Sequence, residues 1–336
     1  MDAKQVMMPT PKDVIHRDGT AELYRFRPAQ GGAAESDGKP VVLLVPSLIN
    51  QWYVLDLRDG HSVAQACVEA GFDTYCLNWG EPNDEDRFLT WEDVLGRLGR
   101  AIRRVKRFSG RDELGLLGYC MGGTLCSIYA ALNPSSIASL VNLAGPIDFE
   151  HAGTLGQMTK RDWFDAEAIA GAGNVAPQQM QSGFVALRPT SQIGKWVMFA
   201  DRMHDANFLE SFKALDTWAN DNVAFPAAAY QTYIEDLYQD NLLVKGEHRV
   251  GGERVDLSRI TCPTLTIATS RDHISPEAAT RGLHDGVSSE DKELYVIPGG
   301  HVGGVVGSRG PRHCYPKITE WFGERLTSKS DAAKAS

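Results

Sequence analysis

Short runs of apolar, often β-branched residues recur along the chain and are separated by segments with helical periodicity. Residues 41–45 form a continuous apolar run that ends at Pro46, which is typical of a strand buried on both faces. Similar runs follow at 74–78, 114–117, 140–143, 264–268 and 293–297. Between them, apolar residues recur at three- and four-residue steps, as in 95–108. This alternation predicts an α/β fold with a mostly parallel sheet covered by helices on both faces.

The alternation stops between residues 148 and 254, where the chain is rich in Trp, Phe and Tyr without a regular period. A strand run then returns at 264, so we predict a helical cap over 148–254, inserted in a sheet domain that spans 40–147 and 255–326. A second, independent domain is the alternative for the inserted part. Residues 1–39 are predicted to lead into the sheet domain, and the polar tail 327–336 to be disordered.

Composition narrows the classes of protein that the chain can belong to. There are 34 basic and 43 acidic residues, for a net charge of -9, so nothing favours binding to nucleic acid. No stretch approaches the roughly 18 uncharged apolar residues of a membrane-spanning helix, and the first twenty residues hold no apolar run of a secretory signal. The six cysteines form no CxxC pair. A reduced, cytoplasmic setting is therefore expected.

The clearest chemical motif is Gly118-Tyr-Cys120-Met-Gly122, which follows the strand run at 114–117 and precedes a helical segment at 124–132. It matches the nucleophile elbow of α/β-hydrolase folds, with cysteine in place of the usual serine. The glycines suit a strand that turns sharply into a helix. A thiol at the N-terminus of that helix is favoured in its reactive thiolate form. The alternative is a buried cysteine in a glycine-rich turn.

Two further polar residues follow strand runs in the order of an α/β-hydrolase triad. Asp272 lies just after the run at 264–268, and His301 just after the run at 293–297. Because ligand and catalytic groups gather at the carboxyl edge of such sheets, we expect His301 to take the proton of Cys120 and Asp272 to orient the imidazole. His273, beside the acid, either supports Asp272 or is an ordinary loop histidine. No pair of histidines has metal-ligand spacing, so no metal site is expected.

An acyl-transfer site also needs donors for the negative oxygen that develops on the carbonyl. The backbone N–H of Met121, directly after the nucleophile, is the first candidate. The second donor should come from the loop after the run at 41–45, where Ile49 is the candidate.

Several segments together resemble one family, the polyhydroxyalkanoate (poly-3-hydroxybutyrate) synthases. The resemblance lies in residues 46–57, 78–82, 117–124, 270–273 and 298–301, and in the cap in 218–226 and 233–241. It implies that the family's catalytic cysteine, aspartate and histidine correspond to Cys120, Asp272 and His301. One departure is Asn78, where many relatives have another polar residue before the tryptophan.

The chain lacks the long N-terminal region of the one-subunit synthases and resembles the short catalytic subunit of the two-subunit (class III) type. The resemblance implies an acyltransferase that polymerises 3-hydroxyacyl-CoA through an acyl-cysteine, with release of CoA and without a cofactor. It also implies a second, activating subunit, a homodimer, and a place in the cytoplasm at the surface of polyester granules. Water must be kept from the acyl-cysteine, so we expect an apolar cap over the thiol.

Two other functions remain open from the sequence. The elbow Gly118-Tyr-Cys-Met-Gly-Gly123 also resembles that of dienelactone hydrolases, and the same triad could serve a thioesterase or a depolymerase if water reaches the intermediate. The second is a non-enzymatic relative that binds granules as a scaffold, which the intact triad disfavours.

Overall fold

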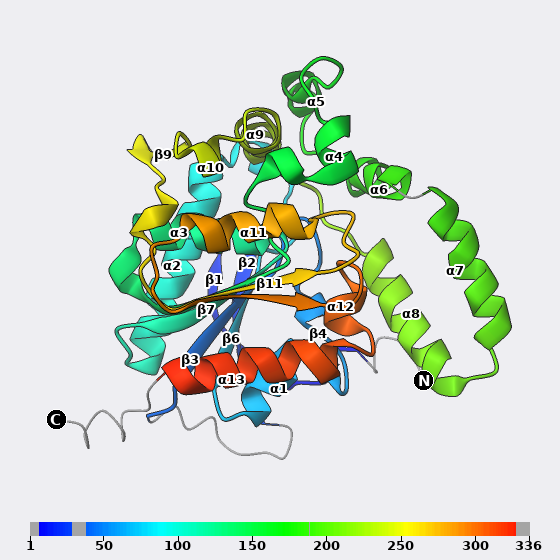
Figure 1. Cartoon of the computed structure of the whole chain (residues 1–336), viewed down its shortest axis with the longest axis horizontal. Helices are drawn as coiled ribbons and strands as arrows, with labels where there is room; N and C mark the ends of the chain where they lie inside the picture. The colour runs from blue at the N-terminus through cyan, green and yellow to red at the C-terminus, as the bar shows by residue number, and fades with distance from the viewer. Residues whose placement is uncertain (1–6, 29–37, 188, 327–336) are drawn as a thin grey trace.

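A computed structural model describes residues 7–28, 38–187 and 189–326. Its centre is an eight-stranded sheet in the order β1-β2-β6-β3-β7-β8-β11-β12 (Figure 1). The strands of this sheet are β1 (Lys12–Asp18), β2 (Ala21–Phe26), β3 (Val41–Val45), β6 (Asp73–Asn78), β7 (Leu114–Tyr119), β8 (Ile137–Leu143), β11 (Thr264–Thr269) and β12 (Lys292–Ile297). The six from β6 to β12 pair in parallel and coincide with the six predicted runs. The predicted α/β fold with a mostly parallel sheet is confirmed.

The segment 1–39, which the sequence set apart as a lead-in, contributes two strands to this sheet. β1 and β2 form an antiparallel hairpin, and β2 pairs antiparallel with β6. The reason for the difference is the edge position: most of β1 is at least partly exposed, so its sequence, KDVIHRD, has no apolar run. The parts of the lead-in at 1–6 and 29–37, and the tail 327–336, lie outside the described residues.

Helices cover both faces of the sheet (Figure 1). One face carries α2 (Trp91–Ser109), α3 (Met121–Leu132) and α11 (Glu277–Gly286), whose apolar side chains join one buried cluster with the strands. The opposite face carries α1 (Val63–Glu69) and α13 (Tyr315–Arg325), which belong to a second cluster. The sheet is therefore buried on both sides, as its β-branched strands require.

The ends of α2 show how local sequence sets an element of this core. The Thr90 hydroxyl accepts from the N–H of Asp93, and the Asp93 carboxylate accepts from the N–H of Thr90, so a capping box opens the helix. Gly110 ends it in the left-handed conformation. Between them, Leu98 and Ile102 of the predicted apolar stripe face the sheet and are fully buried, whereas Phe108 at the end of the stripe is exposed.

The inserted part is mostly helical and shares its core with the sheet. Phe225, Tyr230 and Tyr233 of the cap belong to the same buried cluster as Leu95 and Leu98 of α2. In Figure 1 the helices α7 and α8 lie at the side of the molecule, with α7 outermost. Within the described ranges, no helix is long and apolar enough to cross a bilayer. The elements of the cap are α4 (Gly153–Met158), α5 (Ala166–Gly171), α6 (Pro177–Leu187), α7 (Pro189–Arg202), α8 (Ala206–Asn220), α9 (Ala227–Thr232), a π-helix (Tyr233–Gln239), α10 (Leu242–Lys245), β9 (Arg249–Val250) and β10 (Glu253–Arg254).

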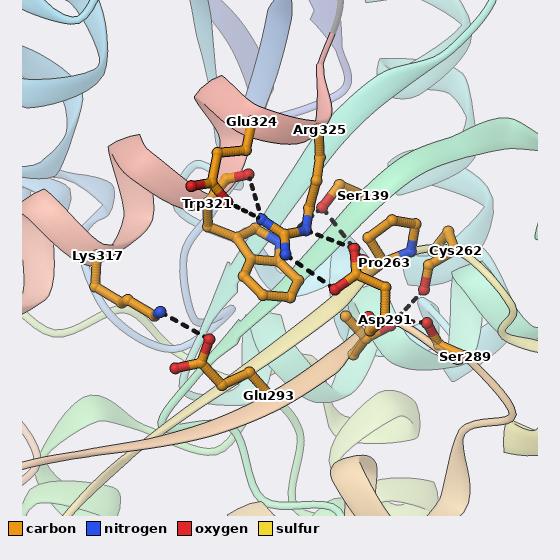
Figure 2. Close-up of polar contacts among 11 residues, drawn as sticks. Ser139, Cys262, Pro263, Ser289, Asp291, Glu293, Lys317, Trp321, Glu324 and Arg325 are labelled. Carbon is orange, nitrogen blue, oxygen red and sulfur yellow. Dashed lines mark hydrogen bonds and ion pairs between the residues drawn. The ribbon is translucent and has the colours of Figure 1, made fainter.

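The last helix of the core, α13, is fastened to the sheet by a polar cluster (Figure 2). The guanidinium of Arg325 donates to both carboxylate oxygens of Asp291, at 2.7 and 2.9 Å, and lies 3.4 Å from the ring centre of Trp321. The indole N–H of Trp321 donates to the hydroxyl of Ser139 at 2.9 Å. Two-point ion pairing and a cation–π contact at one arginine hold this helix in register with β8 and β12. The core also contains several small elements, among them β4 (Asp56–Arg58), β5 (His61–Ser62) and α12 (Gly303–Val306).

Candidate active site

Cys120 occupies a sharp bend between β7 and α3. Its φ is 56°, a backbone angle that costs free energy in a residue with a side chain and that is found mostly at functional sites. A Cβ on Gly118 would lie 2.3 Å from the carbonyl oxygen of Gly122, and a Cβ on Gly122 would lie 2.1 Å from that of Val45. Only glycine fits at either position. The bend therefore explains the residue pattern that the sequence showed.

The structure brings the three predicted triad residues together at the carboxyl ends of β7, β11 and β12. Nδ1 of His301 lies 2.7 Å from Oδ2 of Asp272, and both side chains are buried. Because an ionised carboxylate only accepts, Nδ1 carries the proton, and Nε2 is free to accept one. Nε2 is buried and has no hydrogen-bond partner among the described residues. The thiol of Cys120 is close enough to interact with the ring electrostatically, although the contact falls short of a formed hydrogen bond, as is common before substrate binds.

Opposing effects set the charge of the pair. Burial alone would lower the pKa of His301, but the negative charge of Asp272, its hydrogen bond to the ring and the neighbouring Cys120 outweigh it and raise that pKa well above its usual value. Burial likewise would raise the pKa of Asp272, but His301 and two backbone N–H donors hold it below the usual value. The imidazole can therefore keep a proton taken from the thiol, with Asp272 as its counter-ion.

The support of Asp272 comes from groups that the sequence did not single out. Its carboxylate accepts from the hydroxyl of Thr269 at 3.0 Å and from the N–H groups of Ile274 and Ser275 at 2.9 and 2.8 Å. His273, the candidate supporter, is exposed and is not one of these donors. The available signal was local: an aspartate commonly accepts from backbone N–H groups two and three residues later.

Tyr119 is a further residue of the site that the sequence analysis did not predict. Its ring stacks on the imidazole of His301, with the centroids 5.4 Å apart and the planes 29° from parallel. The side chain is buried, and its hydroxyl has no hydrogen-bond partner among the described residues. Its place directly before the nucleophile was the only signal in the sequence. The stacking restrains the plane of the imidazole.

The two candidate oxyanion donors border the same pocket as the thiol. Met121 is the first residue of α3, so its N–H has no partner within the helix. Ile49 lies in the loop after β3, and its N–H is 3.5 Å from the hydroxyl of Ser47, at the limit of a hydrogen bond. Both residues line the pocket beside Cys120. The arrangement suits a carbonyl oxygen held between two N–H groups.

A pocket with an empty volume of about 1000 Å³, including the space at its mouth, opens above Cys120. Most of its lining comes from the cap, including Leu155, Met158 and Phe184, and no charged side chain lines it. Tyr233 and Tyr238 also line it, and burial, together with the neighbouring Cys120, raises the pKa of both hydroxyls. At neutral pH these hydroxyls therefore keep their protons and can act as hydrogen-bond donors in a mainly apolar space.

The Asp272–His301 pair should make stability depend on pH. The pKa of His301 is raised from 6.5 on folding. Its contribution to the free energy of unfolding is therefore complete below about pH 6.5 and is lost as the pH rises through its pKa in the folded state. The pKa of Asp272 is lowered from 3.8 on folding. Its contribution to the free energy of unfolding is therefore complete above about pH 3.9 and is lost as the pH falls through its pKa in the folded state. We expect Asp272→Asn to lower the free energy of unfolding more at about pH 5.5 than at about pH 9. Urea unfolding of both proteins measures this, and equal losses at the two pH values would contradict it.

Comparison with known proteins places this site in a family. Residues 40–307 match the family described as alpha/beta hydrolase fold. The chain is also 32% identical over 319 residues to the poly(3-hydroxyalkanoate) polymerase subunit PhaC of Allochromatium vinosum, covering 94% of this chain and 89% of that protein. The chain belongs to the poly(3-hydroxyalkanoate) polymerase family. The family resemblance seen in the sequence is thereby confirmed.

A second member of the polymerase family and two solved structures extend the comparison. The subunit PhaC of Haloferax mediterranei is 33% identical over 326 residues, which are 96% of this chain but 65% of that longer protein. Among solved structures, a thermophilic esterase from Thermogutta terrifontis aligns over 95% of this chain and 99% of its own, with a TM-score of 0.51 at 16% identity. The thioesterase domain of the curacin biosynthetic pathway covers 93% and 98%, with a TM-score of 0.52 at 13% identity. These structures support the fold alone.

Proposed function

We propose that this protein polymerises 3-hydroxyacyl-CoA into polyhydroxyalkanoate, with release of CoA, through an acyl group carried on Cys120. The observation that supports this most directly is the Cys120–His301–Asp272 arrangement at the floor of an apolar pocket. A thioester substrate suits a cysteine nucleophile because one thioester is exchanged for another. The relatives that carry the polymerase name are similar in sequence to this chain over nearly its whole length.

In the first step, the sulfur of Cys120 attacks the thioester carbonyl and its proton passes to Nε2 of His301. Asp272 stabilises the imidazolium that forms. The carbonyl oxygen becomes negative between the N–H groups of Met121 and Ile49. When the carbonyl re-forms, the bond to the sulfur of CoA breaks, and CoA leaves with the proton from His301.

In the second step, His301 removes the proton from the hydroxyl of another 3-hydroxyacyl unit. The hydroxyl oxygen attacks the carbonyl of the acyl-cysteine, an ester bond forms, and the sulfur of Cys120 takes back the proton. Such base catalysis contributes about 10²–10⁴-fold. The apolar lining disfavours water, which would otherwise hydrolyse the intermediate. This scheme uses no cofactor and no metal ion, because the thioester itself drives the transfer.

We also propose that the chain is the catalytic member of a two-subunit enzyme and acts as a homodimer at the surface of polyester granules in the cytoplasm. The support is twofold: the relatives are named as subunits, and α7 exposes Ile193, Trp196 and Val197 by 68%, 56% and 55%. Exposed apolar residues in such number commonly mark an interaction surface. Light scattering of the purified protein measures the oligomeric state, and a monomer at all concentrations would contradict the dimer.

The experiment that tests the function is incubation of the purified protein with 3-hydroxybutyryl-CoA. Free CoA and insoluble polyester are measured in parallel by chromatography and turbidity. Release of CoA with polyester supports the proposal. Release of CoA with free 3-hydroxybutyrate and no polyester would instead support a hydrolase, and no acylation of Cys120 would contradict both.

A further inference from the structure

The part of the pocket between α4, α5 and α6 has a lining of its own. Six of its side chains are alkyl or aromatic: Leu155, Met158, Phe164, Ile169, Met180 and Phe184. Thr159 and Gln179 also line the pocket here, but the Thr159 hydroxyl donates to the carbonyl of Leu155, and the side-chain oxygen of Gln179 accepts from the N–H of Ala176. The helices α4 and α6 pack against each other, and most of these side chains contact the buried core cluster without being fully buried themselves. We call this space, defined by these six residues, the α6 chamber.

Other polar groups of the pocket belong to residues that line it together with the thiol. The N–H groups of Met121 and Ile49 border the site of the carbonyl, and Tyr233 and Tyr238, whose pKa values are raised in part by the neighbouring Cys120, add two hydroxyls. A 3-hydroxyacyl group has a carbonyl and a hydroxyl that can use such donors. The rest of that group is an alkyl substituent on its third carbon. The α6 chamber is the part of the pocket whose chemistry matches that substituent.

One position leaves the α6 chamber open. Gly183 lies inside α6 and lines the pocket, and a Cβ built on it would meet no heavy atom within 4 Å. Its backbone is not in the left-handed region that excludes larger residues. Glycine is a poor residue for a helix interior, where alanine is more favourable. A larger side chain at this position would therefore fit the backbone and fill the chamber.

We propose that the α6 chamber receives the alkyl substituent of the 3-hydroxyacyl group, that the enzyme therefore accepts substituents longer than the methyl of 3-hydroxybutyrate, and that Gly183 sets the length it accepts. This inference rests on the proposed function and adds the class of substrate. Each methylene transferred from water into an apolar space gains up to about fourfold in binding. Longer substituents should therefore increase the rate of acylation until the chamber is filled.

The test compares the wild-type protein with Gly183→Ala and Gly183→Leu. Acylation of Cys120 by 3-hydroxybutyryl-, 3-hydroxyhexanoyl- and 3-hydroxyoctanoyl-CoA is followed by mass spectrometry of the intact protein in a single turnover. The wild-type protein is expected to react with all three. The leucine variant should keep its rate with the four-carbon substrate within about threefold and lose at least tenfold with the eight-carbon substrate, a discrimination that pocket size commonly achieves. The alanine variant should lie between them.

Gly323→Leu is the matched control. Gly323 also lies inside a helix, α13, where an added Cβ meets no heavy atom within 4 Å, and α13 is on the opposite side of the sheet from α4, α5 and α6 (Figure 1). The Gly323→Leu variant should react like the wild-type protein with all three substrates. Circular dichroism checks that each variant is folded.

Three outcomes would overturn the inference. The first is a wild-type protein that reacts with the four-carbon but not the eight-carbon substrate, which leaves the proposed function standing. The second is an equal loss on all substrates in a folded leucine variant or, if that variant does not fold, no selective loss in the alanine variant. The third is no acylation by any substrate, which contradicts the proposed function and this inference with it.

Discussion

Cys120→Ala is expected to abolish acylation by 3-hydroxyacyl-CoA, with a loss of about 10⁴-fold or more, as for removal of other catalytic nucleophiles. No other described cysteine lines the pocket, so none can replace its sulfur. Alanine keeps the Cβ at the strained backbone angle, so the fold should be preserved. Single-turnover release of CoA, measured by chromatography, gives the rate, and thermal unfolding checks the fold.

Two variants control this experiment. Cys120→Ser places an oxygen where the sulfur was and should leave measurable but strongly reduced activity, because a hydroxyl is far less ionised than a thiol at neutral pH. Cys262→Ala removes a partly buried thiol outside the pocket and should leave the rate unchanged. Continued turnover by the alanine variant would show that another group is the nucleophile.

His301→Gln is expected to lower the rate of acylation by about 10²–10⁴-fold, because it removes the base that accepts the thiol proton. Glutamine can still donate a hydrogen bond to Asp272, so the pocket should keep its shape and the change in KM should be small. The measurement is kcat and KM for release of CoA from 3-hydroxybutyryl-CoA.

His273→Gln is the matched control for that variant, since it makes the same change at a histidine next to Asp272 in the loop after β11. The side chain of His273 is exposed, and we expect its rate to stay within about threefold of the wild type, as for most surface substitutions. A similar loss in both variants would mean that His301 has no special part in the chemistry. A loss in the His273 variant alone would mean that His273, not His301, is the base.

The central strands could be predicted because a strand buried on both faces is mostly apolar, and the partly exposed edge strand β12 still contains an apolar run. All six runs, from 41–45 to 293–297, became parallel strands of the sheet. The hairpin of β1 and β2 could not be found in this way. β1 is largely exposed at the edge, so its stability comes from pairing with β2, and its own sequence shows no run.

The positions of Cys120, Asp272 and His301 also followed from the sequence, because the carboxyl ends of parallel strands meet at one edge. The surroundings of these residues did not. The donors to Asp272 are mainly backbone N–H groups, which every residue has. The stacking of Tyr119 on His301 and the α6 chamber depend on how distant segments pack, and no local pattern encodes that packing.

The core that the cap shares with the sheet limits how substrate can enter. Phe225, Tyr230 and Tyr233 are buried together with α2, so lifting the whole cap would expose that interior to water at a high free-energy cost. By contrast, neither α4 nor α6 contains a fully buried residue. Small outward displacements of these two helices are thus the least costly way to admit a CoA thioester, and the rest of the cap can stay in place while they occur.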